Sequence, residues 1–307
     1  MFLETFLQVA ILFVMIFIGF ALAKFKVLTE KGVSSMTDMV LLIVTPCVII
    51  KSFIRPFETQ VLKELLLSFL LSFLSLLFFI LVSRLLFLKS EENTKRVLQF
   101  GIIFSNCGYM SLPLQQALLG DNGVFFASSY IAMFNLLIWS YGILLMSGDK
   151  KYLTPKKILI NPGIIGIAIG FIIFLLSIPM PKIIVEPISY LASLNTPLPM
   201  IIIGFHLAHS NIFAAFKSIK FLFSILLRLV LLPIAVLLLM YICSIKGDML
   251  ISLTISCCAP TAAISTMFSS KFNRDTELSV SMVSVSTLLS IVTMPLVISF
   301  AQYLSVL

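Results

Sequence analysis

Apolar residues in this chain form long uninterrupted runs, and polar residues are confined to short breaks between them. A helix that spans a bilayer needs about 20 consecutive, mainly apolar residues, whereas the strands of an outer-membrane barrel would alternate apolar and polar positions. Runs such as 65–88 and 221–245 do not alternate. The pattern predicts an all-α polytopic membrane protein with ten transmembrane helices, near residues 3–23, 36–54, 64–88, 96–119, 123–147, 159–178, 184–208, 218–244, 248–270 and 276–305.

The composition agrees with this class and argues against several functions. Of the 307 residues 60% are hydrophobic and 11% are charged, which is too little charge to cover a soluble protein of this size. The net charge of +8 includes no run of five or six basic residues, so no nucleic acid partner is expected. An enzyme is not expected either, because HExxH and GxSxG motifs are absent and the two histidines lie far from any carboxylate cluster. The five cysteines lie in apolar runs without metal-type spacing, so neither a metal nor another resident cofactor is expected.

The basic residues predict the orientation in the cytoplasmic membrane. If the N-terminus lies outside, the inside loops hold 15 Lys and Arg residues and the outside loops hold 5. Because cytoplasmic loops carry the excess of Lys and Arg, both termini are expected to be extracytoplasmic. The first apolar run lacks a basic n-region and a cleavage site, so it is expected to be a span and not a removable signal peptide.

The chain also repeats itself. At an offset of 151 residues Thr45-Pro46 falls on Thr196-Pro197, and Ser105 falls on Ser256. Each half holds five predicted spans, and an odd number inverts the second half relative to the first, as in many secondary transporters. The predicted organisation is a first five-helix repeat, a short cytoplasmic linker and a second five-helix repeat, at residues 1–147, 148–158 and 159–307.

Two predicted spans contain helix breakers near their centres. The fourth span carries polar residues, a glycine and Pro113 between residues 105 and 113, and the ninth carries Pro260 among polar residues between 256 and 266. A broken helix exposes unpaired backbone groups, which are tolerated at membrane depth only against protein or a watery cavity. Half-helix N-termini at such breaks are suited to an anion. The alternative is an ordinary proline kink in each span.

The residues at these breaks resemble the auxin efflux carrier family. The resemblance is carried by Ser105-Asn106-Cys107-Gly108-Tyr109, Leu112-Pro113-Leu114, Asn161-Pro162, Pro197-Leu198 and Ala259-Pro260, and it extends over nearly the whole chain. It implies two inverted five-helix repeats whose fourth and ninth helices are broken and cross at prolines, a fold similar to that of the bile acid and sodium symporters. The short segment after residue 147 resembles prokaryotic members, which are usually assigned to organic-acid anions.

The resemblance also implies where substrate binds. Asn106 matches an asparagine that contacts the substrate carboxylate, and Pro113 and Pro260 match the two crossover prolines. Cys257, which the 151-residue offset pairs with Asn106, departs from a second asparagine near the other crossover. The expected substrate-binding residues are Asn106, Cys107, Gly108, Pro113, Asn135, Ser256, Pro260 and Thr261.

Further polar residues inside apolar runs are candidates for coupling or gating, namely Asp38, Thr45, Pro46, Asn195, Pro197 and Arg228. Asp38 is the best acid for proton coupling, unless it reaches the interface or pairs with a base. Arg228 either extends to the cytoplasmic interface or attracts anions into an inward vestibule. Asn135 and Asn195 either line the cavity or bond a neighbouring helix.

The sequence therefore predicts a secondary transporter of small organic-acid anions, with the substrate held where helices 4 and 9 cross. Voltage-driven export is favoured, since no buried acid pair at mid-depth supports an obligatory proton relay. The alternative is a sodium- or proton-coupled symporter of an organic or bile-acid-like anion. Substrate, coupling ion and oligomeric state stay open, a homodimer included.

The charge count makes the first testable prediction. A cysteine introduced as Lys150→Cys, in the expected cytoplasmic linker, should react with a membrane-impermeant maleimide only after the cells are opened. Labelling of this position from outside intact cells would contradict the predicted orientation.

Overall fold

The structure, a computed structural model, describes residues 2–87, 91–153, 161–209 and 218–306. Its elements are α1 (Phe2–Lys24), α2 (Glu30–Met39), η1 (Val40–Val44), α3 (Thr45–Phe53), α4 (Thr59–Leu85), α5 (Glu92–Ile103), η2 (Cys107–Ser111), α6 (Leu112–Leu137), η3 (Ile138–Gly142), α7 (Ile143–Ser147), η4 (Lys150–Tyr152), α9 (Pro162–Leu175), α10 (Lys182–Ser193), α11 (Pro197–Ala208), α12 (Ile219–Leu226), η6 (Leu227–Leu231), α13 (Leu232–Ile242), α14 (Gly247–Cys258), α15 (Ile264–Lys271) and α16 (Thr276–Val306). Within these ranges the only β-type pairing is an isolated bridge, so the predicted all-α class agrees with the fold.

Seven helical runs in the described ranges are long and apolar enough to cross a membrane, and α9 and α14 are shorter apolar helices. The run over Cys107–Ser147 is 41 residues long, which exceeds one span of roughly 20 residues. Gly120 interrupts it with a left-handed φ of 61°, between the predicted fourth and fifth spans. The arrangement of ten spans as two inverted repeats stays a prediction, and residues 154–158 of the predicted linker lie outside the described ranges.

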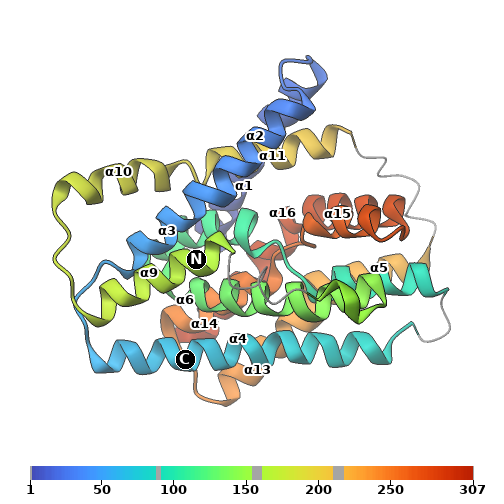
Figure 1. The fold of residues 1–307 in the computed structure, drawn as a ribbon. Coiled ribbons are helices and arrows are strands. Elements are labelled where there is room, and N and C mark those ends of the chain that lie inside the picture. The colour runs from blue at the N-terminus through green and yellow to red at the C-terminus, as the bar shows by residue number, and fades with distance from the viewer. Residues whose placement is uncertain (1, 88–90, 154–160, 210–217, 307) are drawn as a thin grey trace.

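Small residues allow the closest approach of two helices. A Cβ added to Gly204 in α11 would lie 2.0 Å from the carbonyl oxygen of Ile16 in α1, and one added to Gly19 would lie 2.3 Å from the carbonyl oxygen of Ile201. Membrane helices associate through such small-residue contacts because lipid gives little hydrophobic driving force. Helices α1 and α11 are therefore held backbone to backbone, across the upper part of Figure 1.

The remaining helices pack around the inner ends of α5 and α14. Helices α3, α9 and α10 pack together at the left of Figure 1, α4 runs along its lower edge, and α5 and α15 lie at the right. Helix α14 packs against α6 and α16 in the interior. Both α5 and α14 stop among these neighbours, so the ends of two helices are buried together and their backbone groups need partners.

Three of the prolines inside helical runs share one local arrangement. Pro46, Pro113 and Pro233 are each the second residue of an α-helix that directly follows a five-residue π turn. A proline has no N–H and crowds the carbonyl one turn earlier, and the wider π turn is a common site of local bending. The π turn accommodates each proline, and the chain continues as helix on both sides.

Candidate functional site

The central feature is a crossing of two short extended segments. Helix α5 ends at Ile103 and α14 ends at Cys258, and the chain then continues as an antiparallel pair bridged at Ser105 and Thr261. The N–H of Asn106 donates to the carbonyl of Pro260 over 2.7 Å, and the N–H of Ala262 donates to the carbonyl of Phe104 over 2.9 Å. These bonds satisfy backbone groups that the broken helices leave free.

The two breaks have different local causes. Pro260 disfavours helix at the residue before it, and Ala259 is accordingly extended, with φ −60° and ψ 149°. The first break contains no proline. There, the side chain of Asn106 accepts from the N–H of Tyr109 over 3.3 Å and caps the next helical turn, as a short polar side chain does at a helix start.

The predicted crossing at two prolines is therefore correct for Pro260 and wrong for Pro113. The first break occupies residues 104–106, and Pro113 is buried inside the helix that begins after it. The chain can continue through Pro113 because the π turn η2 precedes it. Long-range pairing of residues 104–106 with the second break accompanies the local cap at Asn106 and holds the end of α5 in place.

The equivalence between the breaks also differs from the predicted offset. Helices α5 and α14 each have 12 residues, and α14 begins and ends 155 residues after α5 (92 to 247, and 103 to 258). The offset between these two helices is thus about one helical turn longer than the predicted offset of 151 residues. At 155 residues Asn106 falls on Thr261, and Cys257 lies inside α14.

Arg228 joins the ends of both broken helices. Its guanidinium donates from Nη1 to the carbonyls of Ile102, at 3.0 Å, and Ile103, at 3.5 Å, in the last turn of α5. From Nε and Nη2 it donates to the carbonyl of Ala259, at 3.0 and 2.8 Å, and from Nη2 to that of Cys257. A helix C-terminus carries about half a negative charge, so the two ends together approximately balance one guanidinium.

Both expected positions of Arg228 are wrong. Its side chain is 0% exposed, so it neither reaches an interface nor lines an open vestibule, and the ring of Phe79 lies 5.4 Å from the guanidinium carbon. The long side chain turns inward because unsatisfied carbonyls at the crossing accept its hydrogen bonds, which offset the cost of burying its charge.

A second buried polar cluster fastens α6 to α14. The amide nitrogen of Gln115 donates to the hydroxyls of Ser111, at 2.6 Å, and Ser256, at 2.9 Å. Ser252 donates to the amide oxygen of Gln115 over 2.7 Å and to the carbonyl of Gly123 over 2.9 Å. Sequence reasoning missed Gln115, although an amide inside an apolar run is a signal of interhelical hydrogen bonding.

The first break is the more open side of the crossing. Asn106 is 7% exposed, and within the described ranges no hydrogen bond uses its amide NH2 group. Apart from its chain neighbours and the backbone of its own helix, no described atom lies within 4 Å of the position that a Cβ would take on Gly108. Cys107 is buried beside them at the first position of η2. An amide donor and open space therefore occur together at the positive end of the helix that starts here.

The second break is more enclosed. Thr261 is fully buried, its hydroxyl donates to the carbonyl of Gly101 over 3.0 Å, and its N–H donates to the hydroxyl of Ser286 over 3.0 Å. Ser256 accepts from Gln115, and the carbonyl of Pro260 accepts from Asn106. These expected binding residues lie at the crossing, but their polar groups already have protein partners.

Asn135 lies away from the crossing contacts and bonds a neighbouring helix. Its side chain accepts from the amide of Asn161 over 2.9 Å and donates to the carbonyl of Ile131 over 2.9 Å. Asn161 in turn caps α9 by accepting from the N–H of Gly163. Of the two expected roles for Asn135, the structure supports the interhelical bond.

The coupling and gating candidates are spread over several helices. Thr45 and Pro46 begin α3, where a Cβ on Gly166 of α9 would lie 3.0 Å from the Cα of Pro46, so they form a helix contact. Asp38 is exposed on α2, close to the side chain of Tyr109 in η2.

Asn195 and Pro197 lie where α10 passes into α11, with Pro197 at the first position of α11. Asn195 is buried, and its amide oxygen has no hydrogen-bond partner among the described residues. No three His, Cys, Asp or Glu side chains of the described ranges come together as a metal site requires. The polar chemistry of the interior is therefore that of amides, hydroxyls, backbone groups and one arginine.

Apolar spanning helices around a buried crossing of broken helices define a multi-pass membrane protein of the transporter class. The sequence model of the family described as membrane transport protein, the auxin efflux carrier family, matches residues 5–298. The chain belongs to this family, whose members are transporters and not enzymes. A search of curated proteins gives no match.

The geometry of Arg228 makes a prediction about stability. Arg228→Gln should lower the free energy of unfolding by about 3–5 kcal/mol, because buried carbonyls lose a charged donor. Arg228→Lys should lose less, since an ammonium keeps the charge but cannot span both helix ends as the planar fork does. Thermal stability in detergent without added lipid measures both, with Arg84→Gln, an exposed arginine on α4, as control. Equal melting of Arg228→Gln and the control would contradict the structural role.

Proposed function

We propose that this protein is a carrier of small organic-acid anions across the cytoplasmic membrane, and that the anion binds at the first break of the crossing. The proposal rests on a difference between the C-terminal and the N-terminal helix ends at the crossing. The carbonyl ends of α5 and α14 are occupied by Arg228, whereas the unused amide donor of Asn106 lies next to the open space at Gly108.

The electrostatics of this arrangement favour an anion. The N-terminus of the helix that begins at Cys107 carries partial positive charge and free N–H donors. Arg228 neutralises the negative ends of α5 and α14, which would otherwise repel a carboxylate at the neighbouring segment 104–106. A binding site made of amides and dipoles holds an anion without a permanent counter-ion and can release it.

The same contacts argue against a cation that is bound at the crossing. In transporters with broken helices, unwound carbonyls and half-helix C-termini coordinate the coupling Na⁺. Here Arg228 donates to the carbonyls of Ile102, Cys257 and Ala259, so a tethered cation occupies the groups that sodium would need. This favours movement of the anion down the membrane potential without a coupling ion.

The proposed architecture completes the mechanism. Ten spans as two inverted five-helix repeats, with both termini extracytoplasmic, would bring α5 and α14 into the membrane from opposite sides. The equal lengths of these helices support the repeat. Alternating access would then expose the site near Gly108 to each side in turn, by motion of the helices around the crossing against α1, α3, α9 and α11.

Asn106 gives the site test. Asn106→Ala removes one hydrogen bond to a charged ligand, worth about 1.5–3 kcal/mol, so the substrate affinity should fall roughly tenfold to over a hundredfold. Asn106→Asp should abolish binding, since a second carboxylate repels the first. Asn122→Ala, at an exposed asparagine of α6, is the control. A folded Asn106→Ala protein with unchanged affinity for a transported dicarboxylate would remove Asn106 from the site.

The dependence of transport on membrane voltage tests the proposed mechanism. In proteoliposomes, a clamped voltage of 100 mV is worth about 2.3 kcal/mol per charge and should drive about a fiftyfold accumulation of a monovalent anion on the positive side. The accumulation should be the same when choline replaces sodium and when the pH is equal on both sides. Flux that ignores voltage and requires a sodium or proton gradient would favour the symporter instead, with Asp38 as the first residue to test.

A further inference from the structure

A basic cavity opens where α4 and α7 end and α5 begins, away from the crossing. Its volume is about 410 Å³, and the residues that matter for its chemistry are Arg84, Glu92, Lys95, Arg96, Gln99 and Tyr141. Gln99 belongs to its inner wall, because its amide is buried and donates to the carbonyl of Ser83. Three cations and one carboxylate thus surround one cavity, with a net charge of +2.

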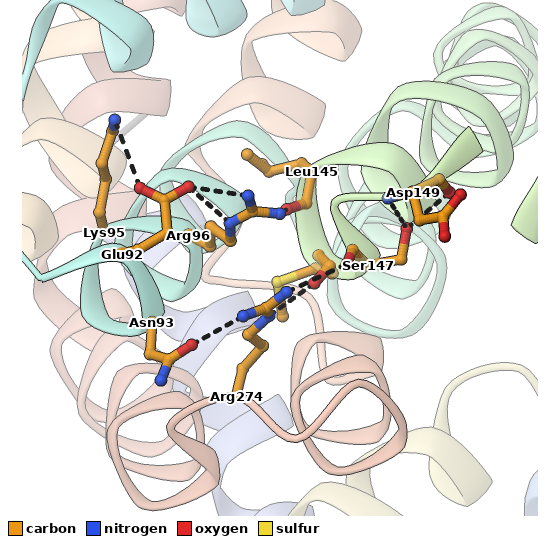
Figure 2. A network of polar contacts seen from close by, with 9 residues as sticks. Glu92, Asn93, Lys95, Arg96, Leu145, Ser147, Asp149 and Arg274 are labelled. Atoms are coloured by element: carbon orange, nitrogen blue, oxygen red, sulfur yellow. Dashed lines mark hydrogen bonds and ion pairs between the residues drawn. The ribbon is translucent and has the colours of Figure 1, made fainter. Parts of the chain in front are cut away.

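The single carboxylate of this cavity, Glu92, already pairs with an arginine. Glu92 accepts from Nε and Nη2 of Arg96, each at 2.8 Å, and the hydrogen bond from Arg96 lowers the pKa of Glu92. The remaining terminal nitrogen of Arg96 donates to the carbonyl of Leu145 over 2.8 Å. Figure 2 shows this group, with Lys95 reaching toward the same carboxylate from 3.8 Å. Arg96 therefore uses three of its five N–H donors within the protein.

Arg84 and Lys95 keep most of their donors. Arg84 donates from Nε to the hydroxyl of Tyr141 over 3.1 Å, and its two terminal nitrogens have no partner in the described part of the chain. Lys95 makes only the 3.8 Å ion pair with Glu92 there. Both side chains line the cavity, so two positive groups are available to an anion within it.

The neighbouring charge is also positive. Arg274 donates to the carbonyls of Met146 and Ser147 at the end of α7, beside Arg96 on Leu145 (Figure 2). Burial lowers the pKa of Arg274, and the positive charge of Arg96 lowers it further. Two arginines thus share one helix end, and an anion in the adjoining cavity would relieve their repulsion.

The cavity lies where the lipid-facing surface of α4 ends. Leu81 and Leu85, on either side of Arg84, are 54% and 75% exposed. Such leucines are expected to face acyl chains, and basic and tyrosine side chains beyond them are expected at headgroup level. Tyr141 supplies that tyrosine, with its ring 5.1 Å from the guanidinium carbon of Arg84. A ligand that fits both surfaces is anionic at one end and apolar at the other.

We propose that this cavity binds the phosphate headgroup of an anionic phospholipid, with Arg84 and Lys95 on the phosphate and the acyl chains along Leu81 and Leu85. Basic pockets between helix ends bind anionic headgroups through such charges. The ligand chemistry is a phosphate ester, and the exposed leucines favour a lipid over free phosphate. The site is separate from the crossing and is independent of the proposed transport function.

The test compares lipid binding by two charge-matched variants. Native mass spectrometry of the detergent-solubilised protein would count bound phosphatidylglycerol and phosphatidylcholine for wild type, for Arg84→Gln/Lys95→Gln and for Lys31→Gln/Lys150→Gln. The control pair removes the same charge from exposed lysines outside the cavity. Each basic residue near an anionic surface is worth about 1 kcal/mol, so Arg84→Gln/Lys95→Gln should bind phosphatidylglycerol about thirtyfold more weakly, with phosphatidylcholine binding unchanged.

Two results would overturn the proposal. One is equal phosphatidylglycerol binding by Arg84→Gln/Lys95→Gln and by the control pair, since the cavity would then contribute nothing. The other is complete displacement of phosphatidylglycerol by millimolar inorganic phosphate, which would identify a free-phosphate site. Thermal melting of each variant in lipid-free detergent establishes that both are folded, and because the readout is lipid binding, failure here is distinguishable from failure of the transport proposal.

Discussion

The interior of this protein depends on one interaction, the contact of the Arg228 guanidinium with the carbonyl ends of α5 and α14. The C-terminal ends of two helices meet inside an apolar bundle. This brings together two partial negative charges and several carbonyls without N–H partners. Neither water nor lipid is needed to satisfy them, because a side chain from η6 reaches in and donates to both. The charge of Arg228 therefore stabilises the crossing.

The rest of the site follows from that arrangement. Because Arg228 occupies the carbonyl ends, the polar groups that remain available to a ligand are at the N-terminal end of the helix that begins at Cys107. Asn106 and Gly108 lie there. The buried amide of Gln115 ties α6 to α14, so both halves of the chain hold the crossing in place. In a family of membrane transporters, the free amide donors of Asn106 are the groups at which we propose that an anion binds.

Local signals in the sequence predicted what depends on local physics. The length of the apolar runs predicted a helical membrane protein, and Pro260 together with the polar residues of both segments predicted which spans are broken. The exact place of the first break could not be predicted, because it also depends on pairing of residues 104–106 with the second break, 155 residues away. The role of Arg228 was hidden for the same reason, since its acceptors lie 29 to 126 residues from it in the chain. A lone arginine in an apolar run with no acid to pair with was the signal for backbone acceptors.

The most direct measurement is a cryo-electron microscopy map of the protein in sodium buffer and in sodium-free choline buffer. The account predicts guanidinium density between the carbonyls of Ile102, Cys257 and Ala259 in both maps, unchanged by sodium. A bound cation at these carbonyls in the sodium map, with Arg228 displaced from them, would contradict it.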